Sequence, residues 1–125
     1  MEFPNQISTK IDNKDLNEII DAIKFINGKL PNLVTLTKEE LCALPKMQEN
    51  TVSFVLDALK KAKRNPELVP KNVEVDEIIK DVELIQSIEK ILIPLRSLMK
   101  TLEDSKTLAS SEAYLPSIAI YNATK

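Results

Sequence analysis

Residues 75–102 read VDEIIKDVELIQSIEKILIPLRSLMKTL, and this stretch decides the fold. Its apolar residues recur every three or four positions, as they do on one face of a helix. They are Val75, Ile78, Ile79, Val82, Ile85, Ile88, Leu92, Leu95, Met99 and Leu102. The period continues on both sides of Pro94, which removes one backbone hydrogen bond, to the carbonyl of Lys90, and presses against that turn. The stretch therefore predicts one long helix with a kink at Pro94.

Two further main helices are predicted upstream. Asp12 or Asn13 is expected to cap the first of them, and five apolar residues form its stripe: Leu16, Ile19, Ile20, Ile23 and Ile26. Gly28 is expected to end this helix in the left-handed conformation that glycine tolerates. The second covers residues 49–64, and its buried stripe consists of Val52, Val55, Leu56, Leu59 and Ala62.

The connection over residues 31–49 contains a short helix of its own. Thr37 and Glu40 have the spacing of a capping box, and Pro45 follows, so a helix through about Leu44 is predicted. Cys42 lies in this helix. A small buried hydrophobe is a more frequent role for a single cysteine than a reactive thiol or an attachment site.

A final helix is predicted to begin at Ser110 or Ser111. The polar residues 103–106, Glu-Asp-Ser-Lys, indicate a solvated bend before it. Its inward residues are expected to be Leu115, Ile118, Ala119 and Ala123. Pro116 costs little within a first turn, where its missing N–H would have no partner.

The predicted architecture is all-α: an antiparallel four-helix bundle, a short extra helix in the first long connection, and a proline kink in the third helix. The chain has 125 residues, which is a single-domain length. Residues 1–11 are expected to form a flexible arm, and residues 12–125 a single domain. A single glycine argues against a β-rich fold, because turns and bulges in sheets use several.

Charge and composition exclude several classes of partner. The chain has 17 basic and 19 acidic residues, so its formal charge of −2 gives no reason to expect nucleic acid. The longest apolar run, residues 91–95, is too short for membrane insertion. The first residues lack the pattern of a signal peptide. A soluble, cytoplasmic protein is expected.

The sequence also lacks most catalytic chemistry. It has no histidine, which removes histidine-ligated metals and triads that use an imidazole base. One glycine cannot form a phosphate-binding loop. We therefore expect no enzyme activity, no cofactor, and no catalytic or metal-binding residues.

Three clusters have a structural explanation beside a functional one. Lys60, Lys61, Lys63 and Arg64 could bind an anion, but cations also stabilise the end of a helix. The carboxylates of residues 74–83 could bind a divalent cation, yet no calcium-loop spacing is present and acidic residues favour a helix start. Tyr114 and Tyr121 lie two turns apart and could line a ligand pocket or partner surface, or rim a core.

Four blocks of the sequence resemble a family of small uncharacterised bacterial helical-bundle proteins. The blocks are KLPNLVTLTKEELCALPKM (29–47), NPELVP (65–70), DVELIQSIEKILIPLRSL (81–98) and SEAYLPSIAIYNATK (111–125). The resemblance covers roughly residues 15–125 and implies a four-helix bundle without an assigned activity. Pro116 departs from it, since the family has an ordinary helix former there.

Two functions agree with these observations. The first is a non-catalytic interaction or scaffold module that docks another protein or a second copy of itself. The alternative is a bundle that binds a small apolar ligand, because a kinked helix can open a cavity. For either function, the expected ligand or partner surface consists of Pro94, Met99, Tyr114 and Tyr121.

Overall fold

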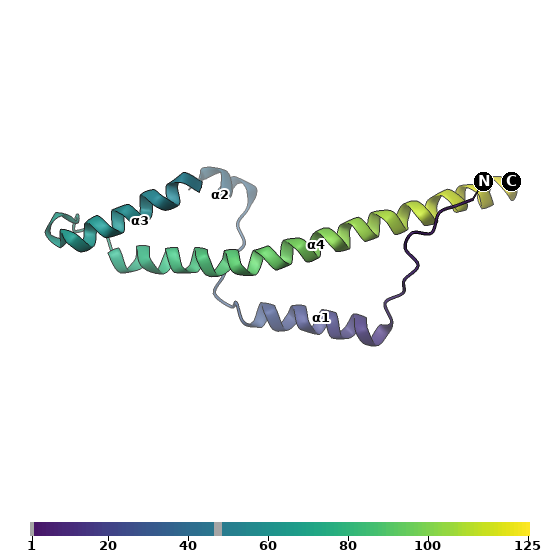
Figure 1. The fold of residues 1–125 in the computed structure, drawn as a ribbon, viewed down its shortest axis with the longest axis horizontal. Helices are drawn as coiled ribbons and strands as arrows, with labels where there is room; N and C mark the ends of the chain where they lie inside the picture. Colours follow the sequence, from purple (N-terminus) through teal and green to yellow (C-terminus); the bar gives the residue numbers. More distant parts are fainter. Residues whose placement is uncertain (1, 47–48) are drawn as a thin grey trace. The chain divides into compact units, whose positions relative to one another are not determined.

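The computed structural model describes residues 2–46 and 49–125, and its regular elements are all helical (Figure 1). In chain order they are α1 (Asn13–Gly28), α2 (Lys38–Ala43), α3 (Glu49–Arg64), the 3-10 helix η1 (Pro66–Leu68) and α4 (Val75–Ala123). No strand occurs in the described residues. The all-α prediction is confirmed, as are α1, the short helix α2 and the helix α3.

The chain forms two compact units. One comprises residues 1–36 together with residues 98–125, so it contains α1 and the C-terminal part of α4. The other comprises residues 37–97 and contains α2, α3, η1 and the N-terminal part of α4. Each unit is described by itself below.

A single helix replaces the two that were predicted after residue 75. α4 runs without interruption through 49 residues, so the predicted bend at residues 103–106 is wrong. These residues include no glycine or proline, and Lys100 forms an i,i+4 ion pair with Asp104 at 2.8 Å. The hydroxyl of Ser110, a predicted N-cap, instead donates to the carbonyl of Lys106 at 2.7 Å, as it does inside a helix.

The helix ends confirm two predicted caps and correct a third. The Asp12 carboxylate accepts a hydrogen bond from the Asp15 N–H at 2.9 Å, and Thr37 and Glu40 form the expected capping box. Gly28 does not have a positive φ and lies within α1. The helix ends instead at Lys29, whose right-handed backbone has φ −83° and whose N–H donates to the carbonyl of Ile26.

No described residue is buried, although part of the α3 stripe and part of the long α4 stripe are half-buried. In α4 the half-buried members are Val75, Ile78, Val82, Ile88 and Leu92. The whole α1 stripe is exposed, and so are Leu115, Ile118 and Ala119 of α4. Cys42 is exposed too, so its assignment as a buried hydrophobe is wrong. The short helix α2 carries no buried residue against which its thiol could pack.

Candidate binding site

Two hollows, or surface pockets, lie in the unit of residues 37–97, where α3 and the start of α4 form a helical hairpin. The turn between the two helices is closed by the local sequence. The Asn65 N–H ends α3 by donating to the carbonyl of Lys61, and Pro66 opens η1, where its missing N–H has no partner to lose. The Val73 N–H then donates to the carbonyl of Pro70 at 3.1 Å. These bonds return the chain toward α3, and α4 begins at Val75.

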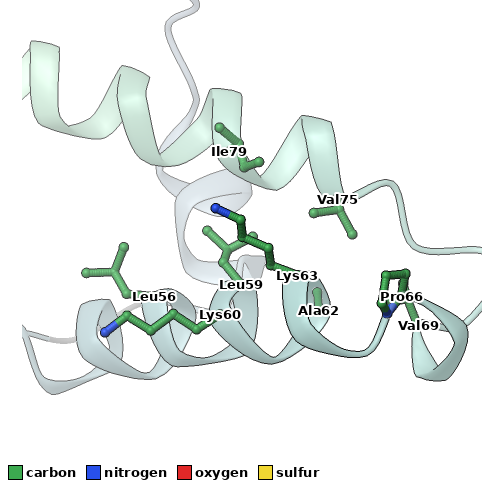
Figure 2. A pocket seen from close by; sticks show the side chains of 9 residues that line it. All are labelled: Leu56, Leu59, Lys60, Ala62, Lys63, Pro66, Val69, Val75 and Ile79. Atoms are coloured by element: carbon green, nitrogen blue, oxygen red, sulfur yellow. The ribbon is translucent and has the colours of Figure 1, made fainter.

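The first hollow lies on one side of this hairpin and measures about 650 Å³ (Figure 2). Most of its lining is apolar, and two lysines stand among the apolar side chains. The lining residues are Leu56, Leu59, Lys60, Ala62, Lys63, Pro66, Val69, Val75 and Ile79. The volume falls within the range of about 300–1,000 Å³ that small-molecule sites have.

A second hollow, of about 540 Å³, shares four lining residues with the first. The shared residues are Leu59, Ala62, Val69 and Val75, and each of them is half-buried. They form the apolar wall between the two hollows. Lys61 is the only charged residue in the lining of the second hollow.

Neither lysine of the first hollow forms an ion pair with a described residue. Ion pairs in residues 2–46 and 49–125 join Lys80 to Glu77, Arg96 to Glu89 and Lys100 to Asp104. Lys60 and Lys63 are exposed and belong to none of these pairs. In Figure 2 the Lys63 side chain extends from α3 in the direction of α4, and Lys60 runs along α3 toward Leu56.

The four residues predicted as a ligand or partner surface lie elsewhere. All four are in α4: Pro94 belongs to the unit of residues 37–97, and the other three belong to the unit of residues 1–36 and 98–125. None of them lines either hollow. Met99, Tyr114 and Tyr121 are exposed, with exposed fractions of 58%, 65% and 67%.

Helix geometry separates these three side chains along α4. At a rise of about 1.5 Å per residue, Met99 lies roughly 20 Å from Tyr114 along the helix axis, and Tyr114 about 10 Å from Tyr121. The Lys125 amino group lies 5.4 Å from the centre of the Tyr121 ring, in a cation–π contact. The three side chains form an extended strip and do not converge on one point.

Some of the residues that line the two hollows could be predicted from the sequence as inward-facing. Leu56, Leu59 and Ala62 belong to the predicted stripe of the second helix, and Val75 begins the long stripe. Val69 and Pro66 were missed because they lie in the connection, where no periodicity marks an inward residue. An apolar residue between two prolines of a short turn, as in NPELVP, is a signal that could have found Val69.

Other kinds of site find no support in the described residues. They contain no group of three or more cysteine or acidic side chains that could hold a metal ion. No helix among them is both long and apolar enough to cross a membrane. Comparison with known proteins found no matching family model, curated protein or solved structure. The resemblance to bacterial helical-bundle proteins therefore stays a prediction.

Proposed function

We propose that the protein is a non-catalytic interaction module whose uncovered apolar helix faces associate with a second copy or with another protein. One observation carries this proposal: about half of the surface of the apolar α1 stripe is exposed. Its five members have exposed fractions between 38% and 53% and are Leu16, Ile19, Ile20, Ile23 and Ile26. Covering five half-exposed aliphatic side chains would contribute on the order of 5 kcal/mol, which is comparable to the stability of a small domain.

The C-terminal part of α4 supports the same proposal. Within residues 111–123 the large apolar residues are Tyr114, Leu115, Ile118, Ile120 and Tyr121, and all are exposed. At 100° per residue they are distributed around most of the helix circumference. A helix that is apolar on all sides is normally surrounded by other structure.

The finer architecture belongs to this proposal. In the associated state the helices complete an antiparallel four-helix bundle, and Pro94 kinks α4, because its ring presses on the turn that contains Lys90. A bacterial origin and a cytoplasmic location rest on the sequence resemblance and on composition. Binding of a small apolar ligand near Pro94, Met99, Tyr114 and Tyr121 remains the alternative, but these residues line neither of the two hollows described above.

Sedimentation velocity over a wide range of protein concentrations tests the proposal. We expect the purified protein to form a dimer or small oligomer, and Ile20→Glu together with Ile23→Glu to shift it toward monomer. The matched control is Lys14→Gln with Lys24→Gln, which changes the net charge by the same two units on α1 outside the stripe. A monomer at every concentration that also melts cooperatively would contradict self-association, since the stripe would then be stable in water.

A further inference from the structure

We infer that the first hollow, between α3 and the start of α4, binds a free medium-chain alkyl carboxylate. Its apolar wall would hold the alkyl chain, and Lys60 and Lys63 would hold the carboxylate. Small-molecule sites combine this kind of mostly apolar lining with a few polar groups. The inference goes beyond the proposed interaction function, because it assigns a ligand to residues that the association faces do not include.

The positions of the two lysines carry the charge part of this inference. They lie three residues apart on α3, so they start from one face of that helix. In Figure 2 the two side chains extend in different directions, and binding of one carboxylate by both requires rotation about their flexible four-carbon stems. Both line the hollow, and neither forms an ion pair with a described residue. A carboxylate accepts hydrogen bonds from two ammonium groups, and such charge-assisted bonds are about twice as strong as neutral ones. The chemistry of the pair therefore favours an anion.

The apolar lining carries the other part. Leu56 and Leu59 from α3 stand opposite Val75 and Ile79 from α4, and Val69 closes the end near the turn (Figure 2). These groups offer no hydrogen-bond donor or acceptor of their own. They match a methylene chain, and a short polar anion such as acetate would leave them in contact with water.

The volume of the first hollow, about 650 Å³, suits a small ligand, since small-molecule sites measure about 300–1,000 Å³. On α3 its lining reaches from Leu56 to Lys63, over roughly 10 Å of helix axis, and Val75 and Ile79 face it from α4. An alkyl chain can lie along this wall with its carboxylate at the lysines.

Isothermal titration of the full chain with octanoate, decanoate and dodecanoate, below their micellar concentrations, tests the inference. We expect saturable binding whose affinity rises by up to about fourfold per added methylene. 1-Decanol should bind about tenfold more weakly than decanoate, because it lacks the charge. Absence of saturable binding for all three carboxylates, or equal affinity for decanol, would overturn the inference.

Two pairs of substitutions locate the site. Lys60→Ala with Lys63→Ala should weaken decanoate binding about tenfold or more. Lys61→Ala with Arg64→Ala removes the same charge from the same turn of α3, yet neither residue lines the first hollow, so binding should stay within about twofold. An equal loss of decanoate affinity in both double variants would show a general effect of charge and would contradict the assignment of the site to the first hollow.

A measurement on the unaltered protein guards against variants that fail to fold. In methyl NMR spectra, decanoate should shift the signals of Leu56, Leu59, Val75 and Ile79 and leave those of Ile118 and Ile120 in place. Shifts confined to the C-terminal part of α4 would contradict the assignment. Sedimentation velocity in the absence of carboxylate reports on the interaction function alone, so failure of one proposal is distinguishable from failure of the other.

Discussion

The backbone N–H of Ile7 donates a hydrogen bond of 3.2 Å to Oε1 of Glu112, a residue 105 positions further along the chain. The other carboxylate oxygen of Glu112 accepts the N–H of Gln6. Both Ile7 and Glu112 are half-buried. One side chain of α4 thus holds two consecutive amides of the N-terminal arm, which the sequence predicts to be flexible.

Removing this carboxylate should release the arm. Glu112→Ala leaves the two N–H groups without a protein acceptor, and we expect faster hydrogen exchange in residues 2–11. The loss of stability should be about 1 kcal/mol, since hydrogen bonds to a charged group are worth more than neutral ones but this site is only half-buried. Hydrogen exchange read by mass spectrometry measures the effect. Glu103→Ala, on the same helix, is the control, and unchanged exchange in Glu112→Ala would show that the arm is held by other contacts.

Replacing Gly28 should stabilise α1. Gly28 has no positive φ, and a Cβ added there would meet no atom within 4 Å. Gly28→Ala should therefore raise stability by about 0.5–1 kcal/mol, because alanine loses less backbone entropy in a helix. Thermal denaturation followed by circular dichroism measures this. Ala22→Gly, in the same helix, should lower the free energy of unfolding by a similar amount. A lower stability of Gly28→Ala would instead indicate that Gly28 adopts the left-handed conformation predicted from the sequence.

The continuity of α4 can be tested at Asp104. Asp104→Pro removes a backbone donor inside the helix and should cost about 3 kcal/mol or more, with a visible loss of helical content. Asp104→Ala is the matched control, because it removes only the exposed ion pair with Lys100, which is worth less than about 1 kcal/mol. Similar melting of the two variants would mean that residues 103–106 form the bend after all.

Sequence periodicity predicts the helices well because they depend on local signals. Asp12 and the Thr37–Glu40 pair satisfy N–H groups within the same turn, and the structure contains both caps. Five members of the long stripe are half-buried, and the first of them is Val75, at the start of α4. Which stripe members are covered depends on partners distant in sequence. Ile85, at the centre of the stripe, has an exposed fraction of 45%, so the same period describes both covered and uncovered positions.

The errors have specific causes. Four polar residues at 103–106 indicate a bend only if a breaker accompanies them, and none does, so the helix continues with an i,i+4 ion pair on its surface. A glycine near a helix end favours a left-handed cap, but Lys29 ends α1 with right-handed backbone. Two of the nine residues that line the first hollow, Pro66 and Val69, were missed because they come from a connection, whose inward residues follow no period.

Truncation after Ser110 distinguishes a structural from an associative role for the end of α4. If Leu115, Ile118 and Ala119 packed inward, as the sequence predicts, the shortened chain would become molten or aggregate. In the structure all three are exposed, so we expect the remaining helices to stay folded and self-association to weaken. The arm should also exchange as fast as in Glu112→Ala, because the anchoring carboxylate is removed. Sedimentation velocity and circular dichroism measure the two effects.

A full-length variant separates these consequences. Tyr114→Ser, Ile118→Ser and Ile120→Ser keep Glu112 and the length of α4 but remove most of its exposed apolar surface. We expect this variant to weaken association as much as the truncation does while the arm remains protected from exchange. Each large apolar side chain covered in an assembly contributes about 1.5–3 kcal/mol, so removing three should move the association midpoint by at least tenfold in concentration. If the truncated chain lost its cooperative transition while the triple variant associated like the original protein, the end of α4 would belong to the core and not to an interface.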